Sequence, residues 1–237
     1  MAIKMRTSPF ISLKDCPADI SIRITKATNT QNRVEKVDFI SLDPEQERIR
    51  GEMEIECGVK YYYQRTSEMV SSEVTCTAEE AAIALACSDS EIDLAVIAKR
   101  ETGKLWDDTQ KEPYTKIFNT ELKATRLWRV VQISRVLQRI LEGKASSASG
   151  RERGICIHGN RFMTHLIFRL INPQVINDPA YDFANYSQNA LPAVIEKIIP
   201  IIVREVERMF PNSLVHQLFR TFTKCRELKI EVLQSLA

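Results

Sequence analysis

The chain has 237 residues, of which 44% are hydrophobic and 27% charged, and its formal net charge is +2. These fractions are typical of a globular protein, and the length suffices for one large domain or two small ones. A charge so near zero argues against a surface that attracts nucleic acid or anionic membranes as a whole. No apolar run approaches the ~20 residues of a membrane-spanning helix, and the first ten residues lack the apolar segment of a signal peptide.

The cysteines are scattered and form no C-x-x-C pair. They stand at Cys16, Cys57, Cys76, Cys87, Cys156 and Cys225. In a chain of this size, this pattern predicts reduced thiols and a cytoplasmic location.

The first predicted element is a half-buried strand, because Ile20, Ile22 and Ile24 alternate with polar residues. A run of short polar side chains follows and could present amides and hydroxyls to a ligand. The candidate ligand-binding residues of this loop are Thr28, Asn29, Gln31 and Asn32. The alternative is that they only cap the helix that follows, as Asn32 could do for a helix containing Val34.

Asp43 and Pro44 predict the start of a helix, with an N-cap residue before a proline at the first helical position. A second strand is predicted from Val59 to Gln64. Gln46 and Arg65 are further ligand-binding candidates, since the planar guanidinium of an arginine suits a carboxylate or a phosphate. Arg65 could equally pair with a neighbouring acid. Two strands alone make a marginal sheet, so they either pair on a helical body or join strands upstream.

Helices dominate the rest of the chain. Thr66 to Thr75 is predicted as an exposed loop, and Thr77 with Glu80 forms a capping box that opens a helix. The longest helical pattern runs from Glu121 to Glu142, with apolar residues on one side. Its other side carries the candidate nucleic-acid-binding residues Arg129, Arg135 and Arg139. A solvated face of an amphipathic helix is the alternative.

Residues 143–153 have the composition of a linker or mobile loop. The predicted organisation is therefore a core portion at 1–142, a linker at 143–153 and a helical subdomain at 154–237. Helices are expected from Ile155 to Ile171, from Asn189 to Phe210 with a kink at Pro200, and from Leu214 to Leu236 in one or two pieces. The predicted fold class is α+β and predominantly α-helical, with a small two-strand β element near the amino end.

Catalytic chemistry is not indicated by any motif. The nuclease-like tripeptides at Glu121 and Glu227 lie in helical patterns without an acidic partner on a strand. Cys156, His158 and His165 do not have the spacing of a zinc site, and no phosphate-binding loop of the G-x-x-x-x-G-K type occurs. We therefore predict no catalytic residue, no metal site and no cofactor.

Two runs of the sequence resemble the AIPR family, the abortive-infection phage-resistance proteins of prokaryotes. The first is TNTQN-x-V-x-x-x-DF-x-SLDP-x-Q-x-RI with Gly58, Tyr61, Tyr62 and Arg65, and the second is Arg153-Gly154-x-x-x-His158-Gly159-Asn160-Arg161-Phe162. The likeness extends from about Asp19 to about Leu170, the scale of a domain. It implies a cytoplasmic phage-defence component, often encoded beside restriction-modification genes. The Asn-Asn-Gly and Asn-Gly-x-Gln-Thr motifs of the family's amino-terminal half do not occur, so this chain is expected to be a carboxy-terminal portion.

The expected function is that of a sensing module for nucleic acid or a partner protein, without a catalytic centre of its own. The alternative is a part of a nucleic-acid-processing enzyme whose active site an amino-terminal half completes. The candidate partners are nucleic acid, that amino-terminal half and another subunit of a defence system. The sequence indicates no membrane partner and leaves the oligomeric state undetermined.

Overall fold

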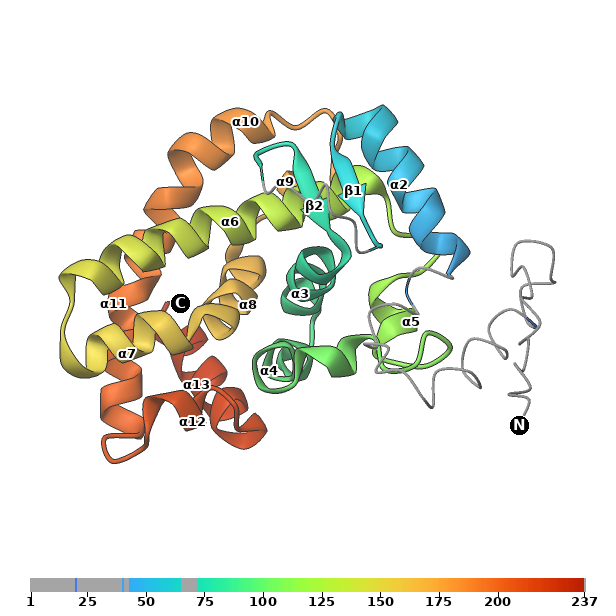
Figure 1. Ribbon diagram of the computed structural model, residues 1–237. Helices are drawn as coiled ribbons and strands as arrows, with labels where there is room; N and C mark the ends of the chain where they lie inside the picture. The colour runs from blue at the N-terminus through green and yellow to red at the C-terminus, as the bar shows by residue number, and fades with distance from the viewer. Residues whose placement is uncertain (1–19, 21–39, 41–42, 65–71, 237) are drawn as a thin grey trace, which may run out of the picture.

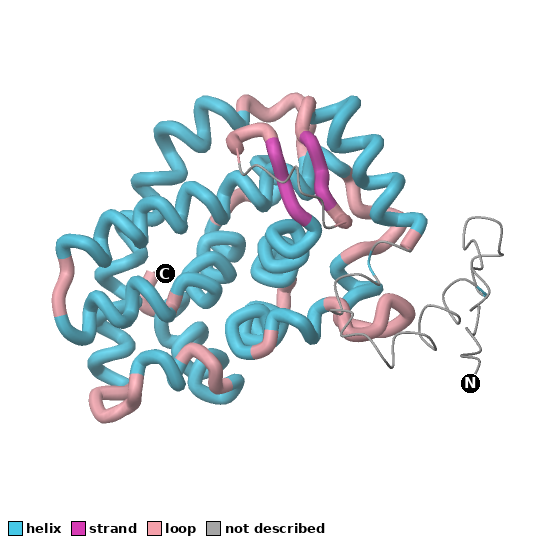
Figure 2. The backbone as a smooth tube through the Cα atoms, viewed as in Figure 1, coloured by secondary structure: helices cyan, strands magenta, loops and turns pink. Residues whose placement is uncertain are grey.

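The computed structural model describes residues 20, 40, 43–64 and 72–236 of the chain (Figure 1). Helices make up most of this part, and one small pair of strands lies early in the chain (Figure 2). The first elements are α2 (Pro44–Cys57), β1 (Lys60–Tyr62), β2 (Thr75–Thr77), α3 (Ala78–Ser88), α4 (Ile92–Arg100), the 3-10 helix η3 (Thr102–Leu105) and α5 (Tyr114–Ile117). The others are α6 (Ala124–Ser147), α7 (Gly150–His158), α8 (Asn160–Leu170), α9 (Pro173–Asn177), α10 (Phe183–Asn185), the π-helical turn η4 (Tyr186–Ala190), α11 (Leu191–Met209), α12 (Val215–Leu218) and α13 (Phe222–Gln234). The predicted α+β, mainly helical class is confirmed.

Helix α2 begins and ends as its sequence dictates. The Asp43 carboxylate accepts a hydrogen bond from the backbone N–H of Glu45 at 3.1 Å, and Pro44 occupies the first turn, as predicted. At the other end, Gly58 adopts the left-handed conformation with φ of 64°, which glycine takes without a steric penalty.

The sheet consists of β1 and β2 in parallel, with Tyr61 opposite Cys76. The predicted strand at Val59 to Gln64 is thus confirmed by β1. Its partner is β2, Thr75 to Thr77, a stretch that begins in the predicted loop and whose β-branched threonines suit a strand. Of the strand predicted at Ile20 to Ile24, Ile20 is described and is helical, and the other residues lie outside the described part of the chain.

Helix α3 packs closely against α6 and α8 because its inward face is made of alanines. Thr77 caps it by accepting a hydrogen bond from the Glu80 backbone N–H at 3.1 Å. This confirms the predicted start of the helix. In a capping box the Glu80 carboxylate would bind the backbone at the start of its own helix. Here it binds Arg135 of α6 instead, so it connects α3 to α6.

Helix α6 is the centre of the molecule. It runs across the view in Figure 1 and contacts α2, α3, α7, α8, α9 and α11. Its buried face includes Leu127, Val130, Val131, Leu137 and Leu141, as the apolar pattern predicts.

Most of residues 143–153, the stretch predicted as a linker or mobile loop, is helical. Helix α6 continues to Ser147, and after Ala148 and Ser149 the chain enters α7, which packs back against α6. The serines fit the helix because their hydroxyls donate to its own carbonyls: Ser146 to Glu142 at 2.8 Å and Ser147 to Lys144 at 3.0 Å. Buried side chains on both sides of this turn form one hydrophobic core. A division into subdomains here stays a prediction.

The helices after α7 differ from the predicted ones mainly in their breaks. The helix expected from Ile155 to Ile171 divides at Gly159 into α7 and α8. Helix α11 spans most of the predicted Asn189–Phe210 helix and contains Pro200. It contacts α6, α8 and α13. The last predicted helix occurs in two pieces, α12 and α13. Among the described helices, none has both the length and the apolar character needed to cross a membrane.

Candidate functional site

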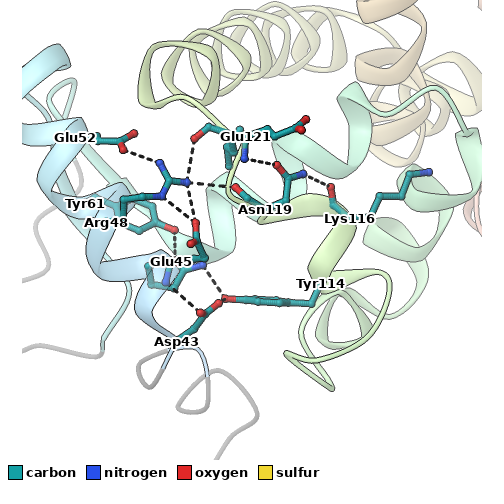
Figure 3. Close-up of polar contacts among 11 residues, drawn as sticks. Asp43, Glu45, Arg48, Glu52, Tyr61, Tyr114, Lys116, Asn119 and Glu121 are labelled. Carbon is teal, nitrogen blue, oxygen red and sulfur yellow. Dashed lines mark hydrogen bonds and ion pairs between the residues drawn. The ribbon is translucent and has the colours of Figure 1, made fainter. Parts of the chain in front are cut away.

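Gln46 of α2, a predicted ligand contact, lies inside the molecule. It is 0% exposed, and its amide nitrogen donates to the Tyr114 hydroxyl at 2.9 Å while its amide oxygen accepts from the Tyr61 hydroxyl at 2.6 Å. The Tyr114 hydroxyl donates in turn to the Asp43 carboxylate (Figure 3). Burial and the bond to Asp43 raise the pKa of Tyr114. Both ends of the amide are satisfied, so Gln46 connects α2 to β1 and α5 and is not presented to a ligand.

Arg48 extends this polar network toward the start of α6. Its guanidinium binds Glu45 and Glu52 of its own helix and donates to the carbonyl oxygens of Asn119 and Leu122 at 3.2 and 3.1 Å (Figure 3). The network thus fixes α2 against the chain that leads into α6. The other predicted ligand-binding residues, Thr28, Asn29, Gln31, Asn32 and Arg65, lie outside the described residues, and their role stays a prediction.

Arg129, predicted on the nucleic-acid-binding face, is buried with 6% of its surface exposed. Its guanidinium donates to the carbonyl oxygens of Val175, Asp178, Pro179 and Tyr181. These carbonyls belong to the end of α9 and the chain after it, where a helix leaves acceptors without partners. Arg129 is therefore held inside the protein and does not lie on an exposed basic face.

Arg135 is also engaged within the protein. It forms a two-pronged pair with Glu80, with both N–O distances at 2.7 Å, and donates to the carbonyl oxygen of Thr75 at 2.6 Å. Its guanidinium lies over the Trp128 ring at 5.1 Å from the ring centre. These contacts join α6 to β2 and α3 and use the planar fork that distinguishes arginine from lysine.

Arg139 is exposed, and its guanidinium makes no hydrogen bond or ion pair with a described residue. It lies on the wall of a groove of about 730 Å³ between α3, α6 and the start of α8. The groove is lined by Ser72, Glu73, Thr77, Glu79, Glu80, Ile83, Ala84, Ser134, Arg135, Gln138, Arg139, Asn160 and Arg161. Of the three arginines predicted to bind nucleic acid, Arg139 is thus the one available to a ligand. A second hollow of about 520 Å³ shares Glu73, Arg135 and Arg139 with this groove and extends toward α11.

The groove carries charges of both signs. Its acids are Glu73, Glu79 and Glu80, and its arginines are Arg135, Arg139 and Arg161. Because the Glu80–Arg135 pair neutralises itself, the charges left in the groove lining are those of Glu73, Glu79, Arg139 and Arg161. A groove of this kind suits the mixed charges of a protein partner better than the continuous negative charge of a nucleic acid.

The second family-like run, Arg153 to Phe162, ends at the junction between α7 and α8, where Asn160 and Arg161 line the groove. Asn160 accepts a hydrogen bond from the Lys99 ammonium at 3.0 Å and donates to Gln138 at 3.2 Å. Phe162 packs on Phe219 with ring centres 5.5 Å apart. The sequence pattern marked this run, but only the fold shows that it places Asn160 and Arg161 in the groove beside Lys99.

Three buried cysteines and one buried histidine are held in their neutral forms. Burial raises the pKa of the Cys76 thiol and brings those of Cys87 and Cys225 to about 12. Burial lowers the pKa of His165 to about 3, so its imidazole is neutral at pH 7. Among the described residues, no group of three or more histidine, cysteine, aspartate or glutamate side chains could hold a metal ion.

Comparison with known proteins identifies one family. A family model described as AIPR protein matches residues 3–213, which include both runs on which the resemblance rests. No curated protein matches the chain, and no solved structure matches it.

Proposed function

Since this chain belongs to the AIPR family, whose members are assigned to abortive infection and phage defence, we propose that it is a sensing module that binds a partner protein in the groove between α3, α6 and α8. The module works in the cytoplasm, in the setting of restriction-modification systems that the family resemblance implies. It recognises a component made or altered during infection.

The groove's charge pattern is the observation that carries this proposal. Arg139 and Arg161 offer guanidinium groups that no described residue binds, and Glu73 and Glu79 offer carboxylates in the same groove lining. A protein surface with complementary charges can satisfy both sets, and such complementarity provides specificity. The mixed lining also explains why binding to nucleic acid is the less favoured interpretation of the same groove.

The states of the Glu80 carboxylate and of two buried thiols favour a role in recognition over one in catalysis. Glu80 is bound by Arg135 on both carboxylate oxygens, so these oxygens are already engaged within the protein. The thiols of Cys76 and Cys87 stay protonated because burial raises their pKa values.

A phage-protection assay in the complete defence system tests the proposal. Arg139→Glu and Arg161→Glu reverse the groove's free positive charges, and each should reduce protection at least tenfold while leaving the melting temperature within about 2 °C, as expected of surface changes. Lys123→Glu is the matched control, because Lys123 is exposed outside the groove and its side chain forms no hydrogen bond or ion pair with a described residue. Full protection by both groove variants would refute the role of the groove.

A nuclease assay separates sensing from the alternative of a nucleic-acid-processing enzyme. Purified protein incubated with Mg²⁺ or Mn²⁺ and DNA or RNA should leave the nucleic acid intact. Cleavage that a Glu121→Ala or Glu79→Gln variant abolishes would favour the enzymatic alternative.

A further inference from the structure

Basic side chains from three elements converge where α7 meets α8. Lys99, near the end of α4, donates from its ammonium group to the Asn160 side-chain oxygen at 3.0 Å and to the Ile157 carbonyl oxygen at 3.5 Å. Arg161 is the next residue along from Asn160, and its guanidinium forms no hydrogen bond with a described residue. Arg220, after α12, donates to the carbonyl oxygen of Arg100, the neighbour of Lys99, at 3.0 Å.

Lys99 is close enough to both arginines for their charges to act on it. The pKa of Lys99 is lowered to about 8, first by burial and then by the charges of Arg161 and Arg220. Two imidazoles stand beside them: the His158 and His216 rings lie 6.1 Å apart. Lys99 and His216 contribute to lowering the pKa of His158, after burial. The positive charges of Lys99, Arg161 and Arg220 therefore lie together near the junction of α7 and α8.

Within the part of the chain that the structure describes, no carboxylate forms an ion pair with Lys99, Arg161 or Arg220. Both acceptors of Lys99 are neutral oxygens, although an ammonium group has three protons to donate. Glu101, which lies near Arg220, is bound to Arg100 at 3.1 Å and to Lys104 at 2.9 Å. Unneutralised like charges reduce stability, and proteins keep such arrangements mainly where function needs them.

We propose that Lys99, Arg161 and Arg220 bind the phosphate group of a small ligand, such as a phosphate monoester or a mononucleotide. Two guanidinium groups and an ammonium group together match the charge and the acceptor oxygens of one phosphate. A polymer is disfavoured because its next phosphates would meet Glu73 and Glu79 along the groove. This inference goes beyond the proposed function, since it requires no role in phage defence and includes Lys99 and Arg220, which do not line the groove.

Thermal unfolding of the purified full chain tests the site, with inorganic phosphate, adenosine monophosphate and an RNA oligonucleotide without a terminal phosphate as probes. At constant ionic strength, the first two should raise the melting temperature with a saturable dependence on concentration. The oligonucleotide should not. Lys99→Met should abolish the rise, and Lys197→Met, which removes an exposed lysine of α11, should retain it.

A measurement without ligand excludes misfolding as the cause of a lost response. Because Lys99→Met removes a repelled charge and keeps an apolar stem, its melting temperature should equal or exceed that of the unmodified chain. Arg220→Gln serves as a second variant and should weaken the phosphate response at least fivefold. The proposal is overturned if phosphate causes no saturable shift, if Lys99→Met responds like the unmodified chain, or if the oligonucleotide binds more tightly than adenosine monophosphate.

Discussion

Gly159 shows why a single small residue is required where α7 and α8 meet. Its φ of −82° is open to any residue, so its conformation does not demand glycine. A Cβ at this position would lie 2.7 Å from the Ile155 carbonyl oxygen and 2.9 Å from the Phe219 ring. The requirement for glycine therefore comes from close packing against the Phe219 ring and the preceding turn of α7.

We expect Gly159→Ala to lower the free energy of unfolding by about 1–3 kcal/mol, as other overpacking substitutions do. Gly143→Ala is the matched control: Gly143 lies in α6, a Cβ added there would meet nothing within 4 Å, and alanine should raise the free energy by about 0.5–1 kcal/mol. Urea denaturation measures both values. Equal stability of Gly159→Ala and the unmodified chain would contradict the packing argument.

His165 links the stability of the protein to pH. It is 0% exposed on α8, its Nδ1 lies 3.2 Å from the Cys87 carbonyl oxygen, and its Nε2 has no hydrogen-bond partner among the described residues. Burial lowers its pKa to about 3, and the charges of Lys229 and Arg169 contribute to this lowering. The imidazole is thus kept neutral in the folded protein.

Between pH 6.5, the ordinary pKa of histidine, and about pH 3, position 165 binds a proton in the unfolded chain but not in the folded one. The free energy of unfolding should therefore fall as the pH drops through this range, by up to ~1.4 kcal/mol per pH unit from this residue. His165→Asn should flatten the dependence, measured by urea denaturation from pH 7 to pH 4. An unchanged slope in His165→Asn would contradict the assignment.

At the scale of elements, Arg129 holds α6 against the end of α9. Its guanidinium satisfies four carbonyl oxygens that lie on a different segment from its own helix. It also packs over the Phe183 ring at 5.4 Å from the ring centre, which brings α10 to the same place. One side chain thus positions the segment from α9 to α10.

Arg129→Met should lower the free energy of unfolding by at least about 2 kcal/mol, because it leaves buried carbonyl oxygens without donors. Arg139→Met, on the exposed side of the same helix, should change it by less than about 0.5 kcal/mol. Hydrogen exchange should report faster opening of α9 in the Arg129 variant alone. Similar losses in both variants would mean that Arg129 is not the structural anchor inferred from its contacts.

At the scale of the whole molecule, α6 lies in one core with the helices before and after it. Leu127 of α6, Leu85 of α3 and Ile199 of α11 belong to the same hydrophobic cluster. A core shared in this way favours cooperative unfolding, since no group of helices can leave without exposing the others.

Urea unfolding followed by circular dichroism and by tryptophan fluorescence should therefore show one coincident transition. Leu127→Ala and Ile199→Ala should each lower the free energy of unfolding by about 2–5 kcal/mol. The single transition should then occur at a lower urea concentration and stay undivided. Leu214→Ala, at an exposed leucine, is the control and should shift it little. Two separate transitions would support the division at residues 143–153 that the linker-like composition suggested.

Local patterns in the sequence were sufficient where the interactions are themselves local. Asp43 and Pro44 start α2, Thr77 starts α3 and the apolar stripe of α6 predicts its buried face, because caps and helical periodicity depend on residues a few positions apart. The family followed from short runs in the same way. Composition was a weaker guide: the glycine and serines after residue 142 suggested a linker, whereas hydroxyl-to-carbonyl bonds allow them in a helix.

The site depended on tertiary structure, because contacts between distant segments decide which polar side chains are free. In the sequence, Arg129, Arg135 and Arg139 are equivalent members of one basic helix face. Folding places α9 over Arg129 and β2 beside Arg135, leaving Arg139 exposed in the groove. Lys99 and Arg161 are far apart in the sequence and meet only because α4 packs on α8. The sequence alone thus determined the helices and the family, and packing decided which charges remain available to a ligand.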